Sequence, residues 1–170
     1  MVAALRAAGE PVPEVVPVSV PVALPTPGAS GNAVGVMVVR LPTAEPDPDV
    51  RLSRIAEITR SAKEEARRQG TFQFSSRWGT RVFAWMARRQ RFVALFVTNV
   101  RGPDRRLEVA GAPLLKAWPV APIQGNVRCS VAAMSHAGCL GIAVHVDADA
   151  VSADEAARAL EMELARLVDD

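Results

Sequence analysis

His136 and His145 are the only histidines in this 170-residue sequence, and both are candidates for proton transfer. An imidazole that a carboxylate positions can remove a proton from a hydroxyl group, which is general-base catalysis. His145 stands four residues before Asp149, near the end of a predicted strand. His136 falls in a predicted hairpin turn, where a histidine is usually a solvated polar residue. We predict structural or surface roles for both and keep catalysis as the alternative, since no catalytic triad can be assigned.

The best candidate for ligand binding is the segment that holds Asn99, Gly102 and Pro103. A strand that ends in a polar residue and a tight turn can present amide and backbone groups to the carbonyl group of a ligand. The competing interpretation is an Asx turn that only caps the strand. Asn126 and Ser130 are weaker candidates of the same polar kind.

A basic and aromatic stretch lies at the centre of the chain. Nine basic and two acidic side chains occur between Arg60 and Arg91, although the net charge of the whole chain is only +2. Three interpretations stay open: a solvated arginine face over buried tryptophans, an amphipathic helix on anionic lipid, and, with the least support, nucleic-acid binding. The residues proposed for the lipid surface are Arg77, Trp78, Arg81, Trp85, Arg88 and Arg89. The nearly balanced charge and the lack of a known motif lead us to expect no nucleic-acid partner.

Hydrophobic patterns predict several strands. Residues 34–41 and 92–100 are almost continuously apolar, as expected of strands covered on both faces. Residues 12–24 are rich in proline and valine, which favours an edge strand or an extended arm, because proline donates no ladder hydrogen bond. Residues 126–134 and 138–146 alternate as two paired strands around a turn.

Helical spacing appears in three segments. The strongest begins at Asp47, a good N-cap that Pro48 follows, and ends at Gly70. A second covers residues 76–90, and the last starts with a capping box at Ser152. Strands and helices mixed in this way predict the α/β class, a two-layer sandwich of mixed sheet and helices.

We interpret residues 1–30 as a truncated helix end and a proline- and valine-rich arm, and residues 31–170 as one domain. A chain that opens with the end of a helix looks cut, and its length fits one half of a larger two-domain protein. It has no apolar run of about 18 residues and no signal-peptide core, which indicates the cytoplasm. In that reducing compartment Cys129 and Cys139 are expected to be two small buried side chains, with no disulfide and no metal site.

A set of short motifs follows a fixed order along nearly the whole chain. Its members are Pro17-Val18-Ser19-Val20, Gly31-Asn32, Leu41-Pro42, Asp47-Pro48, Arg51-Leu52, Thr98-Asn99-Val100-Arg101-Gly102-Pro103, Ala110-Gly111-Ala112, Asn126, Ser135, Gly138 and Asp147. In that order and at those distances, the set resembles the C-terminal region of the wax ester synthase/diacylglycerol acyltransferase family. Two departures are Arg101, where the family usually has proline, and His136, where it often has an aromatic residue.

The resemblance implies a fold like that of the chloramphenicol acetyltransferase and condensation-domain group, in which two α/β halves enclose an active-site tunnel. Acyl-CoA would enter from one side as a substrate, and an alcohol or diacylglycerol from the other. The implied base is the second histidine of a His-His-x-x-x-Asp-Gly motif in the N-terminal half, so no metal or other cofactor is expected. On this interpretation Asn99, Gly102 and Pro103 line the tunnel, while the small Gly111 and Ala112 leave room for an acyl chain or simply pack tightly.

The histidine motif itself is absent from this sequence. His145 imitates it only in part, because no histidine precedes it and Ala150 stands where glycine is needed. We therefore predict a chain that is inactive alone, supplies one wall of the tunnel and partners an N-terminal half. The alternative is a stand-alone, non-catalytic module that binds an acyl ligand or a protein and dimerises through its uncovered face. A homo-oligomer and peripheral contact with a membrane or lipid droplet stay open.

Overall fold

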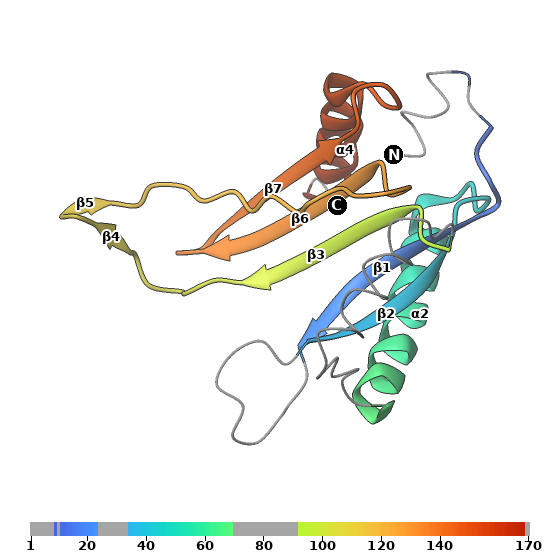
Figure 1. The fold of residues 1–170 in the computed structure, drawn as a ribbon, viewed down its shortest axis with the longest axis horizontal. Helices are drawn as coiled ribbons and strands as arrows, with labels where there is room; N and C mark the ends of the chain where they lie inside the picture. Colours follow the sequence, from blue (N-terminus) through green and yellow to red (C-terminus); the bar gives the residue numbers. More distant parts are fainter. Residues whose placement is uncertain (1–8, 10, 24–33, 70–91, 169–170) are drawn as a thin grey trace. The chain divides into compact units, whose positions relative to one another are not determined.

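The computed structural model describes residue 9 and residues 11–23, 34–69 and 92–168 (Figure 1). The chain forms two compact units: the first contains residues 11–95 and 124–127, and the second contains residues 1–10, 96–123 and 128–170. The predicted helix end at residues 1–8 and the predicted helix at 76–90 lie outside the described residues. The same holds for the proposed lipid-surface residues Arg77, Trp78, Arg81, Trp85, Arg88 and Arg89.

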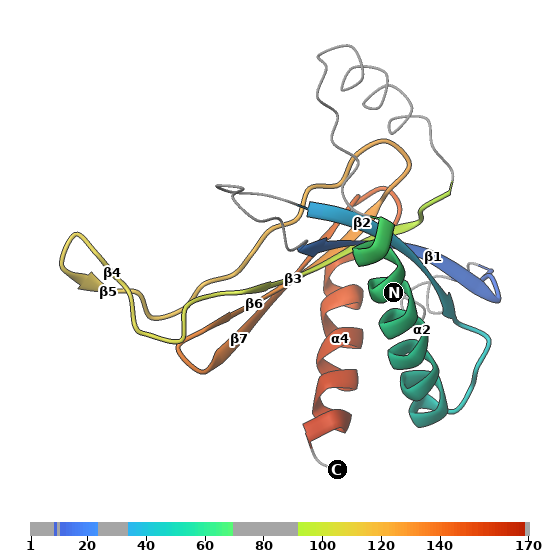
Figure 2. The same cartoon turned by 90° about the horizontal axis from the view of Figure 1, so that it is seen from below.

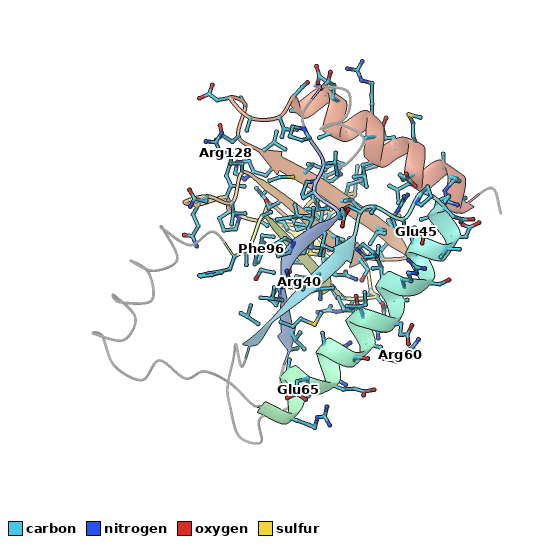
Figure 3. All side chains as sticks on the ribbon, turned by 90° about the vertical axis from the view of Figure 1, so that its right-hand side faces the viewer. Arg40, Glu45, Arg60, Glu65, Phe96 and Arg128 are labelled. Atoms are coloured by element: carbon cyan, nitrogen blue, oxygen red, sulfur yellow. The ribbon has the colours of Figure 1, made fainter. Side chains whose placement is uncertain are left out.

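The first unit is a strand pair covered by one helix. Strands β1 (Val15–Ala23) and β2 (Val34–Pro42) are antiparallel, and helix α2 (Pro48–Gln69) packs on them. Figure 3 shows α2 beside the two strands, with the exposed Arg60 and Glu65 along it. The core joins both layers and contains Val20, Val22, Met37, Val39, Leu41, Ile58, Ala62 and Ala66.

Helix α2 begins where the sequence predicts. The Oδ1 atom of Asp47 accepts hydrogen bonds from the N–H groups of Asp49 (2.9 Å) and Val50 (3.1 Å). These bonds satisfy two of the amide groups that a helix start leaves without a partner. The helix ends at Gln69, just before the predicted stop at Gly70.

β1 carries Pro17 and Pro21, yet it lies between β2 and β3 (Leu95–Arg101) instead of at an edge. The carbonyl oxygen of Pro17 accepts a hydrogen bond of 2.9 Å from the N–H of Ala94, just before β3. The N–H and C=O of one residue point to the same side of a strand, so both prolines turn their missing donors away from β2. The strand order gives β1 a neighbour on each side, so the prediction of an edge strand or extended arm is wrong. The missing donors of the prolines face β3, and the β1–β2 ladder loses none.

β2 has nearly the predicted bounds, but it is not covered on both faces by the described residues. Met37 and Val39 face α2 and are buried, whereas Val36 and Val38 on the other face are 62% and 51% exposed. The apolar run predicts the strand correctly and its burial wrongly, since a continuous apolar run does not show how many faces are covered.

The second unit contains most of β3, the strands β6 (Cys129–His136) and β7 (Cys139–Val146), and helix α4 (Ala153–Val168). The strand order is β2-β1-β3-β6-β7, and β3 begins in the first unit with Leu95. β6 and β7 are antiparallel, and α4 contacts β7 (Figure 2). The hydroxyl of Ser152 caps α4 through the N–H of Glu155, 3.4 Å away.

A small hairpin of β4 (Glu108–Val109) and β5 (Ala112–Pro113) completes the second unit. The sheet with helices confirms the predicted α/β class.

The prediction that residues 92–100 form a strand covered on both faces is wrong at both ends, because Phe92 is 81% exposed and only Leu95 is fully buried in β3. None of the helices in the described part of the chain is long and apolar enough to span a bilayer.

Candidate functional site

The loop of Gly102 and Pro103 lies against the turn between β6 and β7. The N–H of Ala137 donates a hydrogen bond of 3.2 Å to the carbonyl oxygen of Pro103. A Cβ atom added to Gly102 would lie 2.1 Å from the carbonyl oxygen of Ser135, a distance that no real side chain adopts. Only glycine lets the two backbones approach so closely. The candidate ligand-binding loop is therefore fixed in place by the end of β6.

Arg101 pairs with Asp104 across the same loop. Its Nη2 atom lies 3.2 Å from the Oδ2 atom of Asp104. Both side chains are more than three-quarters exposed, so solvent screens the pair and it contributes little stability. The Arg101 side chain is thus accommodated at the surface.

His136 is buried, with only 6% of its surface exposed, so the prediction of a solvated turn residue is wrong. The turn is shorter than predicted and contains only Ala137 (φ 48°) and Gly138 (φ 80°), which fits a type I′ hairpin. His136 thus remains the last residue of β6, opposite Cys139. Its Nε2 atom has no hydrogen-bond partner in the structure.

Ser130 and His145 face each other across β6 and β7 and share one acceptor. The Oγ atom of Ser130 donates to the carbonyl oxygen of Ala121 (2.8 Å), and the Nδ1 atom of His145 lies 2.9 Å from the same oxygen. A carbonyl oxygen has two lone pairs and can accept both bonds. Both side chains therefore anchor the chain near Ala121 to the sheet, which is a structural role.

The overlying segment, residues 117–121, runs along one face of β6 and β7. Ala117 touches that face at Gly141, where an added Cβ atom would lie 2.1 Å from the carbonyl oxygen of Ala117. Residue 121 meets the same face at His145, because 141 and 145 alternate to one side of β7. Between these points the face carries only the small pair Ala132 and Ala143. Close packing of a backbone segment thus explains this strip of small residues.

The other candidate residues do not all gather at one place. Asn99 is exposed within β3, three residues before Gly102. Gly111 and Ala112 lie at the tip of the β4–β5 hairpin, where the left-handed φ of 80° explains the glycine. Asn126 is exposed and belongs to the first unit, in the turn that the bridge between Gln124 and Val127 closes.

The sequence did not reveal three backbone groups that hold this region together. They are the carbonyl oxygens of Ser135 and Ala121 and the N–H group of Ala137. Main-chain groups leave no side-chain signature, and only the glycines that meet them give a signal. Among the described residues, no group of three or more His, Cys, Asp or Glu side chains could hold a metal ion.

The two cysteines differ in exposure, which corrects the prediction of two buried side chains. Cys129 is buried and Cys139 is exposed, and they do not pair in the register, since Cys129 faces Val146 and Cys139 faces His136. Burial raises the pKa of the Cys129 thiol above its ordinary value of 9.0. Cys129 is thus kept neutral and shielded, as a structural thiol is.

We expect one fast-reacting thiol per native chain. A maleimide reagent should label Cys139 at once and Cys129 only after denaturation, as intact-mass spectrometry with a Cys139→Ser control would show.

Because folding raises the pKa of Cys129, its contribution to stability is complete below the pKa of the unfolded thiol. That contribution is lost as the pH rises toward the higher folded pKa. Equal labelling of both cysteines, or stability that increases through this alkaline range, would contradict the assignment.

Sequence comparisons with known proteins agree on one family. Residues 30–167 match the model of the WS/DGAT C-terminal domain. The chain is 34% identical over 146 residues to a probable diacylglycerol O-acyltransferase of Mycobacterium tuberculosis, and equally so to its Mycobacterium bovis counterpart. This match covers 81% of the chain but only 32% of each relative, so the chain spans about a third of their length. A solved wax ester synthase/diacylglycerol acyltransferase from Marinobacter aquaeolei has the same fold (TM-score 0.64, 19% identity), over 91% of this chain and 37% of that one.

Proposed function

Because the chain belongs to the family of WS/DGAT C-terminal domains, we propose that it forms one wall of the substrate tunnel of an acyl-CoA-dependent O-acyltransferase. The observation that carries the proposal is the match of residues 30–167 to the family model, and the alignment with the Mycobacterium tuberculosis relative covers 32% of that protein. Acyl-CoA and an alcohol or diacylglycerol are the proposed substrates, and no cofactor is needed. The product is a wax ester or a triacylglycerol.

The reaction needs a general base, which in the implied motif is the second of two adjacent histidines. This chain has no two adjacent histidines. The base removes the proton of the acceptor hydroxyl, the oxygen bonds to the thioester carbonyl carbon, and the carbon–sulfur bond to CoA breaks. The protonated base then gives its proton to the departing CoA thiolate. We assign this task to neither histidine of the chain, since His136 is buried and no second histidine stands beside either of them. The bond from the Nδ1 atom of His145 to Ala121 leaves the Nε2 atom as an acceptor, and the His145→Ala variant below tests that alternative. The proposed base therefore belongs to an N-terminal half.

The proposed contribution of this chain is to hold the substrate-binding loop in a fixed position. The Gly102-Pro103 loop is fixed by the bond from Ala137 and by the contact with Ser135, while Asn99 nearby in β3 is exposed. A loop held by backbone contacts presents its polar groups without a further loss of entropy when substrate binds. We assign Asn99, Gly102 and Pro103 to contact with the acyl-CoA or the acceptor.

A chimeric enzyme tests the proposal. In it, this chain replaces the matched C-terminal third of the Mycobacterium tuberculosis relative. We expect the chimera to transfer a labelled acyl group from acyl-CoA to diacylglycerol, whereas the 170-residue chain alone gives no product above background. Asn99→Ala in the chimera should lower kcat/KM, with the melting temperature unchanged because Asn99 is exposed.

Two results would count against the proposal. Turnover by the purified chain alone that disappears in His145→Ala would place the base within it. A folded but inactive chimera, together with a dimeric chain in light scattering, would favour the stand-alone binding module. The exposed Val36 and Val38 on β2 would then be the first surface to examine.

A further inference from the structure

Cys139 and His136 face each other at the turn between β6 and β7. They are directly opposite in the register, and only Ala137 and Gly138 lie between them. Residues directly opposite in an antiparallel pair have side chains on the same face of the sheet, with Cβ atoms about 4.5–5.5 Å apart. The cysteine and the histidine are therefore neighbours, with the thiol exposed and the imidazole buried.

The Nε2 atom of His136 is the unusual member of this pair. It belongs to a residue that is only 6% exposed, and it has no hydrogen-bond partner among the described residues. Buried polar atoms without a partner are rare in folded proteins, and each one calls for an explanation. A thiol is both a weak donor and a weak acceptor. A rotation of the exposed Cys139 side chain would therefore give Nε2 the partner that it lacks.

A histidine beside an exposed thiol is the arrangement that makes a cysteine reactive. The thiolate is the nucleophile, and a neighbouring imidazole promotes its formation by taking the proton. The other cysteine, Cys129, has neither feature, since it is buried and lies opposite Val146. The reactive pair is thus specific to the turn.

We propose that Cys139 and His136 form a modification site at which Cys139 exchanges with a low-molecular-weight disulfide. The Nε2 atom of His136 takes the proton of the thiol, and the thiolate attacks one sulfur atom of the disulfide. A new disulfide bond forms at Cys139 while the old one breaks, and the departing thiolate takes the proton from the imidazole. The sulfur of Cys139 is oxidised and the departing sulfur is reduced, so the disulfide itself is the oxidant.

The modification site lies beside the candidate substrate loop. The turn and the end of β3 are at the same end of the sheet (Figure 1), and the N–H of Ala137 donates to the carbonyl oxygen of Pro103. Gly102 of the same loop lies against the backbone of Ser135. Because a two-residue turn allows little independent motion, a displacement at Cys139 reaches the loop.

An adduct on Cys139 has little room on the sheet. Gly141 is the next residue on the same face of β7, and the backbone of Ala117 already covers it closely. His136 occupies the position opposite. The adduct must therefore extend past the end of the hairpin, where we expect it to push the Gly102-Pro103 loop away. The consequence for turnover rests on the proposed function, whereas the exchange itself does not.

Exchange with oxidised glutathione, followed by intact-mass spectrometry, tests the site in the 170-residue chain. We expect Cys139 to react at least about tenfold faster than a cysteine placed at Ala112 in a Cys139→Ser background. Ala112 is exposed in the other hairpin and faces Val109, so it has no histidine opposite. His136→Gln should remove the advantage of Cys139. Equal rates at the two positions would overturn the proposal.

A second measurement needs no variant of His136. The nitrogen-15 resonance of its Nε2 atom should move when glutathione blocks Cys139, because the thiol proton that the ring shares is then gone. The ring of His145, which is bonded to Ala121, serves as the internal reference and should stay unchanged. A His136 resonance that does not move in the modified chain would show that the imidazole plays no part.

The effect on the loop has separate readouts. In the modified chain the amide of Ala137 should exchange at least about tenfold faster, because its bond to Pro103 is broken. Turnover of the modified chimera should fall at least about fivefold and return with dithiothreitol. A protected Ala137 amide in the adduct would refute the displacement of the loop. A freed amide with full turnover would refute the substrate loop and leave the modification site, and an inactive untreated chimera would refute only the proposed function.

Discussion

Replacing Gly102 with alanine should destabilise the second unit by about 3 kcal/mol, at the upper end of the cost of overpacking. The added Cβ atom would lie 2.1 Å from the carbonyl oxygen of Ser135. Backbone cannot swing aside as a flexible side chain can, so the loop and the end of β6 must separate. Separation also breaks the bond between Ala137 and Pro103. Urea unfolding followed by circular dichroism measures the loss.

Gly111→Ala is the matched control for this experiment. Gly111 has a φ of 80° but nothing within 4 Å of an added Cβ atom, so alanine there meets backbone strain without a clash. The strain costs about 1–2 kcal/mol. If Gly102→Ala is no less stable than Gly111→Ala, the close approach of the two backbones does not exist in solution. In the chimera, Gly102→Ala should also reduce turnover, since it displaces the proposed substrate loop.

Met37→Ala should destabilise the first unit by about 3 kcal/mol, within the range for large-to-small core substitutions. Met37 is 6% exposed and belongs to the cluster of Val22 and Val39, against which Ile58 of α2 packs. The substitution removes apolar contacts and leaves a cavity between the strands and the helix. Thermal and urea unfolding with a probe of helix content would detect it.

The neighbouring residue provides the control. Val38 is next in sequence and lies in the same strand, but its side chain is 51% exposed on the other face. Val38→Ala should change stability by no more than about 0.5 kcal/mol. Equal losses in the two variants would show that both faces of β2 are covered in solution, as the sequence pattern predicts.

Elements with local signals were predicted well from the sequence. Asp47 caps α2 through amides two and three residues away, and Ser152 caps α4 in the same manner. Hairpin strands β6 and β7 also follow from alternation, although the turn is shorter than predicted. These features depend on neighbours within a few residues, which is the range that sequence patterns describe.

Features that depend on distant backbone were not predicted. Gly102 was selected as a candidate, but its contact with Ser135, 33 positions along the chain, involves a main-chain oxygen that no residue type encodes. The burial of His136 was not predicted for a similar reason. The register of β6 and β7 decides which residues form the turn, and it makes His136 the last residue of β6. The prolines of β1 were misjudged since the sequence does not say which side of a strand they face.

The hydrogen bond between His145 and Ala121 gives this protein an intrinsic spectroscopic marker. A carbonyl oxygen only accepts, so the Nδ1 atom of the ring must carry a proton while the overlying segment rests on the sheet. An imidazole released into water loses that constraint and exchanges between its two tautomers. Nitrogen-15 resonances of a single ring would therefore report, without any attached probe, how often the overlying segment, residues 117–121, lifts from β7.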